Sequence, residues 1–454
     1  MMKLELASEL IGRADDLTFI VQCAGEGKSC SLVAVSNLGK SALLRHLCNS
    51  ANGPPRKGTY IYVDCNEMPE RSARALFVTI WRALATALYS QVNDPEIRVQ
   101  MDHLYDQMVD SPSGVAAALH FEEGIALALT HLPPPLVLCL DEFDEAYQGV
   151  EPQAFLNLRA LLDRYGDAIA YVTATEREVA RLTNTREQGE FYELVAPRVR
   201  FMHFWEKDET RTYCLHFAER EHVTFDQVDL DFIREQADGH PGLVQAVCYA
   251  LGAVTGAPVR DEHQDRVIHQ LVLSGLADNT NVQSECGKIW GDLEPDEREA
   301  LFGVRQMDPN GQPPNTAGWI GLKNKSIVRD SPDGPVVFSH IFRRFVNRQQ
   351  VVRQPETRGV YLDAEAGNVW VAGNPVRSLT DHEYRLLLFL YGRLGRICDK
   401  YSIVEAVWGE DYVDQVDDAR IEKLVSRVRQ KIEPDSAHPH YLLSLRGRGY
   451  KLVA

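Results

Sequence analysis

The chain has 454 residues, of which 44% are hydrophobic and 25% charged, and its formal net charge is −17. A chain of this length exceeds what one hydrophobic core supports, so we expect about two to four domains. The acidic charge excludes a protein that coats nucleic acid over its whole surface, and no apolar run reaches the roughly 20 residues of a membrane span.

The N-terminal stretch MMKLELASELIGRADD lacks the apolar core of a signal peptide. Nine cysteines are scattered singly along the chain and never form a Cys-x-x-Cys pair. This usage argues against both a disulfide framework and a zinc site. We therefore expect a cytoplasmic protein with reduced cysteines and no membrane partner.

Short apolar segments alternate with longer helical patterns through residues 1–205. Such alternation is typical of a parallel sheet with helices on both faces, so an α/β core is predicted here. Five segments are predicted as its strands: Cys30–Val35, Tyr60–Asp64, Leu136–Leu140, Ile169–Thr173 and Val199–Phe204.

The tripeptide Gly-Lys-Ser occurs twice, within GEGKSCSLVAVSNLGKS at residues 25–41. A phosphate-binding loop needs a buried strand before it and a helix after it, because N–H groups at the helix N-terminus then converge on the anion. Only the second copy has the apolar run CSLVAV before it and the helically spaced ALLRHL after it. The first copy, with Gly25, Gly27 and Lys28, is predicted to be an ordinary turn.

The second copy fits the Walker A frame Gly-x-x-x-x-Gly-Lys-Ser/Thr, except that Ala34 replaces the first glycine. Alanine is compatible with this position if its φ stays negative. We expect Lys40 to reach the β and γ phosphates and Ser41 to hold Mg²⁺. The residues predicted to bind the nucleotide are Ser36, Asn37, Leu38, Gly39, Lys40 and Ser41.

The segment PLVLCLDEFDEAY reads as a buried strand that ends in Asp141 and Glu142. This is the Walker B arrangement, in which Asp141 positions Mg²⁺ through water and Glu142 orients the attacking water. The alternative is an acidic surface turn after a core strand. Because both motifs occur in the right order and at strand ends, the sequence predicts a P-loop site for ATP or ADP with Mg²⁺.

Four segments are predicted after the core. Residues 206–281 have a helical pattern and are predicted to form a helical lid. Residues 282–350 combine helical patterns with the turn-rich DPNGQPPN and DSPDGP, which suggests a small winged-helix-like domain. Residues 351–358 read as a polar linker to a separate domain at 359–454, and no internal repeat or low-complexity tract is found.

Residues 1–350 resemble the STAND branch of the AAA+-related P-loop ATPases, on the two motifs above and on three further segments. In LIGRADDL, the resemblance implies that Gly12 and Arg13 lie near the adenine; a plain helix N-terminus is the alternative. In YVTATERE, it makes Thr175 and Arg177 candidates to sense the γ-phosphate, with ordinary polarity at a strand end as the alternative.

The third segment, DGHPGLVQAV, resembles the lid box of this family and implies that Pro241 packs near the base. In STAND relatives a winged-helix histidine can touch the bound diphosphate. His340, in FSHIF, is the candidate for that role here, and a structural histidine is the alternative.

Residues 420–432 have a helical pattern with two faces. One face is apolar, with Ile421, Val425, Val428 and Ile432 at spacings of i, i+4, i+7 and i+11. The other face suits the major groove, where arginine pairs with guanine and glutamine with adenine. Its members are Arg420, Lys423, Arg427 and Gln430. The alternative is a solvated charged face.

Residues 355–454 resemble the OmpR/PhoB winged helix on SLTDHEYRLLLFL, VWGE, RIEKLVSRVRQKIEP and LRGRGYKL. The resemblance implies that the two-faced helix is a recognition helix and that Arg446 and Arg448 lie at the wing turn, where they can enter a minor groove. Residues 420–451 carry eight basic and three acidic side chains, yet the whole region carries fourteen and fifteen. That acidic balance favours the alternative of docking on protein.

Together these features predict an ATP-switched DNA-binding regulator of transcription with slow ATPase activity. Its predicted partners are double-stranded DNA, further copies of the chain on ATP binding, and an unidentified protein that delivers the signal. One rival is an ATPase that loads or remodels proteins on DNA during replication or transposition. Another is a defence scaffold whose winged helix binds protein.

Overall fold

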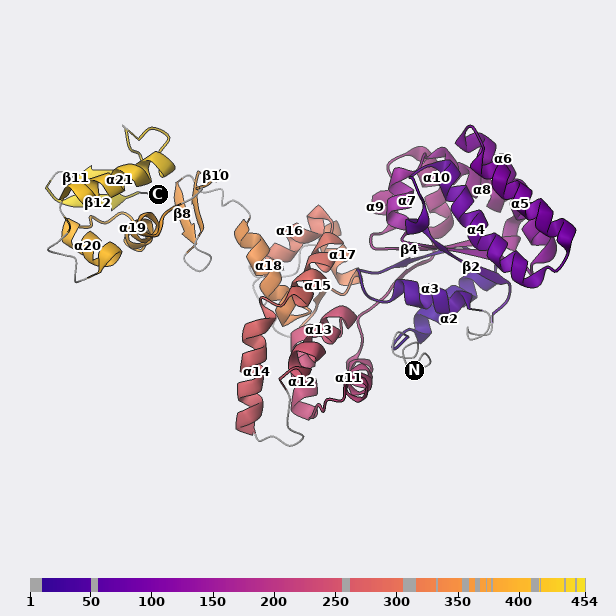
Figure 1. The fold of residues 1–454 in the computed structure, drawn as a ribbon, viewed down its shortest axis with the longest axis horizontal. Coiled ribbons are helices and arrows are strands. Elements are labelled where there is room, and N and C mark those ends of the chain that lie inside the picture. Colours follow the sequence, from indigo (N-terminus) through magenta and orange to yellow (C-terminus); the bar gives the residue numbers. More distant parts are fainter. Residues whose placement is uncertain are drawn as a thin grey trace. The chain divides into compact units, whose positions relative to one another are not determined.

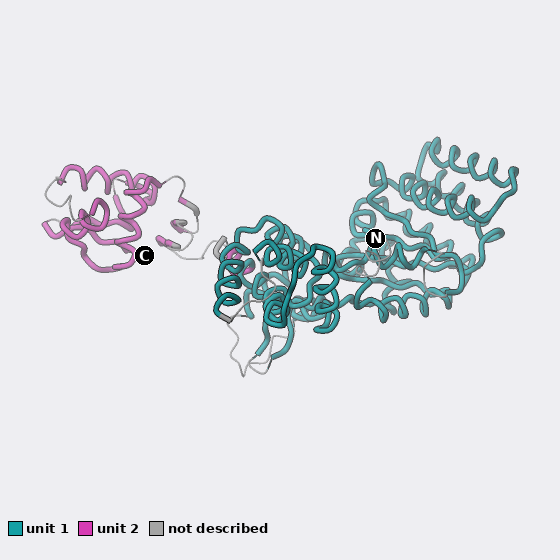
Figure 2. Tube along the Cα trace, turned by 60° about the horizontal axis from the view of Figure 1, so that its bottom comes forward, with its two compact units in different colours: residues 1–345 teal, residues 346–454 magenta. Residues whose placement is uncertain are grey.

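The computed structural model describes residues 10–49, 56–254, 262–304, 316–331, 334–352, 359–363, 368–372, 374–376, 379–409, 416, 418–436, 438–445 and 447–453. The chain divides into two compact units, residues 1–345 and 346–454 (Figure 2). Most of the predicted linker, residues 353–358, lies outside the described residues, as does Arg446.

A five-stranded parallel sheet forms the centre of the first unit. Its strands are β1 (Cys30–Val33), β2 (Thr59–Asp64), β3 (Leu136–Asp141), β4 (Ile169–Thr175) and β5 (Val199–Phe201). They lie in the order β2-β3-β4-β1-β5, with every neighbouring pair parallel. The five predicted strands and their parallel arrangement are confirmed, although the last strand ends three residues earlier than predicted.

Helices cover both faces of this sheet (Figure 1). On one face lie α2 (Ala14–Gly25) and α3 (Lys40–Cys48); the other face carries α4 (Ala73–Gln91), α5 (Pro95–Val109), α6 (Gly114–His131), α7 (Phe143–Gly149), α8 (Gln153–Tyr165), α9 (Val179–Leu182) and α10 (Arg186–Val195). Short 3₁₀ turns lie at Cys65–Glu67 and Gly166–Ala168. The strands β1, β3 and β4 are buried along their whole length, and this explains why their sequences are largely apolar.

Helices and a small hairpin complete the first unit. The helices α11 (Lys207–Glu221), α12 (Gln227–Ala237), α13 (Pro241–Gly252) and α14 (Glu262–Leu276) follow the sheet. Then come α15 (Thr280–Gly291), α16 (Pro295–Gly303), α17 (Ala317–Asn324) and the antiparallel pair β6 (Val328–Arg329) and β7 (Val336–Val337). The next helix, α18 (His340–Val352), begins in this unit and continues past its last residue, Phe345. The helices α15, α16 and α17, followed by the β6–β7 hairpin, come in the order that is typical of a winged helix.

In the second unit, the end of α18 is followed by an antiparallel sheet of β8 (Val360–Asp363), β9 (Asn368–Val371) and β10 (Asn374–Pro375). The helices α19 (Asp381–Tyr391), α20 (Lys400–Trp408) and α21 (Asp418–Ile432) come next, and the hairpin of β11 (Leu442–Leu445) and β12 (Gly449–Leu452) ends it. This is a winged helix with its own apolar core. In neither unit does the described part contain a helix long and apolar enough to cross a bilayer.

Candidate functional site

The loop between β1 and α3 has the backbone that a phosphate loop requires. Gly39 is the N-cap of α3 with a φ of 90°, and Asn37 takes a φ of 61°. Ala34 is not among the residues with positive φ, so its methyl group is accommodated without strain. The left-handed positions of the loop therefore fall at residues 37 and 39.

The N-terminus of α3 opens into a cavity of about 1280 Å³ that loop residues 36–42 line on one side. No side chain caps α3, so the N–H groups of its first turn remain available to an anion. Lys40 is only 5% exposed, and its ammonium donates to the carbonyl of Ala34 at 2.8 Å. These features fit a phosphate group.

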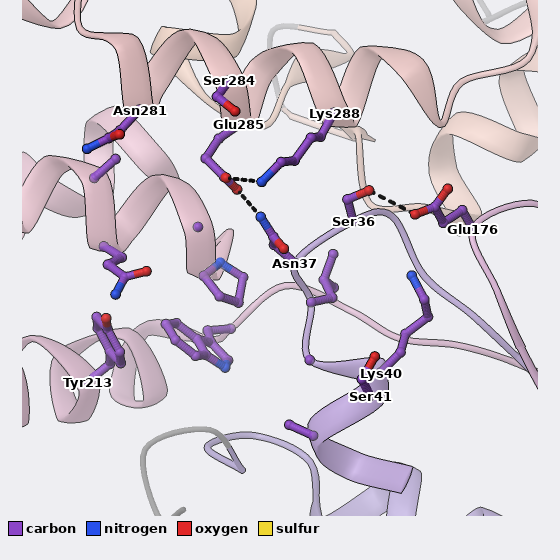
Figure 3. A pocket seen from close by; sticks show the side chains of 18 of the residues that line it. Ser36, Asn37, Lys40, Ser41, Glu176, Tyr213, Asn281, Ser284, Glu285 and Lys288 are labelled. Carbon is purple, nitrogen blue, oxygen red and sulfur yellow. Dashed lines mark hydrogen bonds and ion pairs between the residues drawn. The ribbon is translucent and has the colours of Figure 1, made fainter. Parts of the chain in front are cut away.

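The far wall of the cavity comes from α11, α13 and α15 (Figure 3). Aromatic and apolar side chains from this wall and from the segment just before α11 line the cavity, which suits the base of a nucleotide. They are Trp205, Tyr213, Pro241 and Tyr249, and the amide of Gln245 lies among them.

The first Gly-Lys-Ser forms a turn after α2, as predicted. Gly27 takes a φ of 70° and lies against the backbone of Asp167, where a Cβ would come within 2.2 Å of a carbonyl oxygen. Lys28 is half exposed and pairs with Glu26 at 2.8 Å. This copy therefore has the structure of a tight surface turn with a local ion pair.

The carboxyl end of β3 carries the two acidic residues of the second motif. Asp141 is fully buried and accepts a hydrogen bond from the hydroxyl of Tyr62 at 2.7 Å. Glu142 takes the left-handed φ of 53° at the N-cap of α7 and lines the cavity. For a residue with a side chain, such a backbone costs about 1–3 kcal/mol, which is typical of functional positions.

Burial raises the pKa of Glu142, and the positive charge of Lys40 opposes this shift. A carboxylate with a raised pKa that faces a cavity is a candidate base, because it accepts a proton more readily than a solvated one. The geometry thus brings Glu142 and Lys40 to the same cavity.

A magnesium ion at this site would draw its ligands mainly from the nucleotide and water. No group of three or more His, Cys, Asp or Glu side chains converges on a possible metal position within the described residues. Ser41 lines the cavity, whereas Asp141 ends the core strand β3 and is not one of the lining residues. This sparse oxygen set suits Mg²⁺, which keeps several waters and binds through one or two protein groups plus phosphates.

The end of β4 is arranged differently from the sensor role expected for it. Thr175 is fully buried in the sheet, and Arg177 lies 3.7 Å from Asp144 and 3.8 Å from Glu294. The residue between them, Glu176, lines the cavity instead and accepts from the hydroxyl of Ser36 at 3.0 Å. Sequence reasoning missed Glu176, although it follows the same strand.

The segment that contains Gly12 and Arg13 contacts a residue of the cavity wall but does not itself line the cavity. Arg13 is 2% exposed and donates to the carbonyl of His203 at 2.9 Å. The indole of Trp205 donates to the carbonyl of Ile11 at 2.9 Å, and its backbone N–H donates to Gly239 at 2.9 Å. Neither Gly12 nor Arg13 lines the cavity, so this segment reaches it through Trp205.

The histidine next to the loop is His240, and the expectation for His340 is wrong. His340 begins α18, lies 3.4 Å from Glu235 of α12, and lines a different cavity. His240 is fully buried, caps α13, and its Nε2 lies 3.2 Å from the carbonyl oxygen of Ser36. Burial lowers its pKa to about 4. The position of His240 next to Pro241, in the segment that resembles the lid box, is the sequence feature that could have identified it.

Two carboxylates of the α15 segment also reach the loop, and sequence reasoning missed both. Asp292, the C-cap of α15, accepts from the backbone N–H of Ser36 at 2.5 Å. Glu285 accepts from the side-chain amide of Asn37 at 2.6 Å and pairs with Lys288 at 2.8 Å (Figure 3). Burial, with the nearby Glu176 carboxylate, raises the pKa of Asp292 to about 6.

In the second unit, α21 separates its two faces as predicted. Ile421, Val425, Val428 and Ile432 are buried in the core. The predicted contact residues Arg420, Lys423, Arg427 and Gln430 are all exposed. The guanidinium of Arg420 lies over the ring of Trp408 at 5.7 Å. The predicted contact face of α21 is therefore exposed to solvent, with Arg420 packed on Trp408.

The terminal hairpin places Arg448 at its turn. Arg448 is exposed, and its N–H donates to the carbonyl of Leu445 at 2.8 Å. Gly449 takes a φ of 114° and lies against Cys398, where a Cβ would come within 2.0 Å of a carbonyl oxygen. This close approach anchors the base of the wing.

Residues 373–452 match the protein family described as "Transcriptional regulatory protein, C terminal". Over 97 residues the chain is 39% identical to the sensory transduction protein RegX3 of Mycolicibacterium smegmatis, covering 21% of this chain and 41% of RegX3. The chain thus spans less than half the length of the curated relatives it matches.

Two solved structures resemble parts of the chain. The Walker-type ATPase PABY2304 of Pyrococcus abyssi is similar over 74% of this chain and 96% of its own, with 12% identity and a TM-score of 0.49. The DNA-binding domain of CpxR from E. coli is similar over 22% of this chain and 95% of its own, with 27% identity and a TM-score of 0.19.

The class of protein follows from the sheet, the loop and the family match: a P-loop ATPase-type α/β fold is joined to an OmpR/PhoB-type winged helix. Within that class, the C-terminal domain of this chain is a member of the transcriptional regulatory protein C-terminal family.

Proposed function

We propose that the protein is an ATP-switched, DNA-binding regulator of transcription. The observation that carries the proposal is the presence, in one chain, of an uncapped helix N-terminus at a phosphate-type loop and a transcriptional regulatory C-terminal domain. ATP binding would control the conformation or self-association of the chain. Pairing two winged helices would then raise affinity for a repeated DNA site.

At the nucleotide site, the loop amides and Lys40 would bind the phosphates of ATP or ADP, and Ser41 with Asp141 would hold Mg²⁺. The bound ion would neutralise charge on the phosphates. Glu142 faces the same cavity and would orient the attacking water. A switch of this type hydrolyses ATP slowly, and a signal-delivering protein would set its state.

At the DNA site, α21 would enter the major groove with its exposed basic face, and the wing would contact the minor groove or the backbone. The domain's near balance of acidic and basic residues favours one rival, in which the same winged helix docks on protein. Selection of binding sites from random duplexes by the full chain with Mg·ATP tests the proposal. Enrichment of one sequence supports it, and no enrichment supports docking on protein.

Truncation of Arg427 to alanine is expected to remove a base contact. Because Arg427 lies on the exposed face of α21, its loss should cost about 1–3 kcal/mol and relax sequence preference at one position. Titration of the selected duplex and of single-base variants measures both effects. Arg385→Ala, an exposed arginine of α19 paired with Asp381, is the matched control. Equal affinities for the wild-type chain and the Arg427 variant would remove α21 from the interface.

Truncation of Arg448 to alanine is expected to act differently. A wing arginine that contacts phosphate or a narrow minor groove contributes charge rather than sequence preference. Its loss should weaken binding to many duplexes alike and flatten the salt dependence by roughly one unit of slope. Affinities measured across a range of salt concentrations report the slope, and an unchanged slope contradicts the wing contact.

A further inference from the structure

The strongest unexplained feature of the first unit is a pair of carboxylates seated on the phosphate loop. Glu285 and Asp292 lie about 250 residues further along the chain, yet both accept hydrogen bonds from the loop. We name these two residues the acidic clasp. The bond from the N–H of Ser36 to Asp292, at 2.5 Å, joins an acidic side chain to a backbone donor of the anion-binding loop.

The backbone of the clasp residue Asp292 is held by a buried lysine. Lys325 is 3% exposed, and its ammonium donates both to the carbonyl of Asp292 and to the carboxylate of Glu297, each at 2.8 Å. An ion pair buried this deeply has few alternative arrangements, since either charge alone would be costly to bury. The backbone of residue 292 is therefore fixed by α16 and α17.

Further ion pairs tie the same segment to the end of β4 and to α9. Arg177 lies 3.8 Å from Glu294, and Arg181 lies 2.8 Å from Asp296. These pairs join residues 294–296 to the sheet domain immediately beyond the clasp. The segment thus contacts the nucleotide core at the loop and beside it.

The other clasp residue is accommodated by a glycine. In its observed position the Glu285 carboxylate lies close to the Cα of Gly242, where a Cβ would come within 2.0 Å of an Oε atom. Glu285 also pairs with Lys288, which lines the same cavity. Figure 3 shows both side chains reaching from α15 towards Asn37.

A phosphate and a carboxylate would compete for the same hydrogen-bond donors of the loop. A backbone N–H donates one strong hydrogen bond, so the N–H of Ser36 serves either Asp292 or a phosphate oxygen. Two anions at one position also repel each other in a partly buried cavity where screening by water is weak. Glu176 follows β4 and accepts a hydrogen bond from the hydroxyl of Ser36, so a third carboxylate adds to this repulsion.

We infer that the acidic clasp is an autoinhibitory contact, in which Glu285 and Asp292 occupy phosphate-facing donors of the loop and ATP must displace them to bind. The inference deepens the regulation of the proposed nucleotide site and rests on that proposed function. ATP binding then displaces the carboxylates of Glu285 and Asp292 from the loop donors. Apparent affinity for ATP is reduced by the fraction of molecules in which the clasp is closed.

Four full-length variants test the clasp: Asp292→Asn, Asp292→Ala, Glu285→Gln, and the control Asp278→Asn. The Asn and Gln changes remove charge and keep shape, while the Ala change also removes the acceptor. Calorimetric titration with Mg·ATP should show about tenfold tighter binding for each clasp variant, the scale expected when one charge-assisted hydrogen bond is lost. Asp278 is exposed in the turn before α15, so its variant should bind as wild type does.

A second measurement does not depend on nucleotide. Hydrogen–deuterium exchange of the nucleotide-free chain should be faster at residues 34–41 and 280–292 in the clasp variants than in wild type. Saturating Mg·ATP should produce the same gain across 280–292 in wild type. Unchanged exchange in both comparisons overturns the clasp.

The outcomes separate the two proposals. If wild type binds Mg·ATP and the clasp variants bind no more tightly, the clasp is refuted and the nucleotide site stands. If only the clasp variants bind, the clasp is supported in its strongest form. If no variant binds at all, the nucleotide site is refuted and the clasp with it.

Discussion

Replacing Lys40 by alanine is expected to abolish ATP binding, weakening it on the order of a hundredfold or more. Lys40 begins α3 within the loop, and its buried ammonium lies 2.8 Å from a loop carbonyl, where it can turn to the phosphates. Its loss removes charge-assisted hydrogen bonds and the main positive charge among Glu142, Asp292 and Glu176. Titration with Mg·ATP measures the effect directly.

The matched control for this substitution is Lys28→Ala. Lys28 belongs to the same tripeptide, but it lies in a turn and pairs with Glu26 at the surface. Its variant should bind ATP as wild type does. Equal losses in the two variants would show that the loop was assigned to the wrong copy.

Changing Glu142 to glutamine is expected to leave ATP binding intact and to slow hydrolysis by about 10²–10⁴-fold, the usual contribution of a positioned general base. The substitution keeps the size of the side chain and removes its ability to take a proton. Glu142 faces the cavity from the N-cap of α7, where its backbone takes the left-handed conformation. Phosphate release under single-turnover conditions measures the rate.

The control is Glu145→Gln, in the same helix, where the carboxylate is exposed and pairs with Arg71. This variant should hydrolyse at the wild-type rate. If Glu142→Gln also hydrolyses normally, another group orients the water and the assignment of the second motif is wrong.

The Glu142→Gln variant also distinguishes a switch from an ATPase that loads proteins on DNA. A switch trapped with ATP should bind DNA at least as well as wild type and activate a reporter. A loader needs repeated cycles, so a trapped chain should lose activity in cells. Reporter expression in cells that carry Glu142→Gln therefore decides between the two.

Much of the fold could be predicted because it rests on local patterns. A strand buried on both faces must be apolar along its whole length, and the run from Leu136 to Leu140 shows this directly. The faces of α21 could be assigned from helical spacing alone, since Val425 and Val428 lie one turn apart on the buried side. The loop after β1 and the acidic pair at the end of β3 could be located in the same way, from the apolar strand to which each is attached.

The remaining features depend on distant contacts, for which the sequence carries no spacing signal. Asp292 reaches Ser36 because α16 and α17 hold its backbone, and no local pattern reports that. Trp205 is held in the cavity wall by hydrogen bonds to Ile11 and Gly239 and by its contact with the ring of Tyr213. His340 was misassigned because α18 packs its start against Glu235 rather than against the loop.

The central claim is that ATP binding controls DNA binding, and one measurement tests it most directly. The selected duplex is titrated with the full chain in the presence of Mg·ATP, Mg·ADP or no nucleotide, and with Glu142→Gln in Mg·ATP. The proposal predicts at least about tenfold tighter binding with ATP, which corresponds to roughly 1.4 kcal/mol, and the same tight binding for the variant without decay over time. Equal affinity in all three nucleotide conditions, with ATP shown to be bound, would contradict an ATP switch.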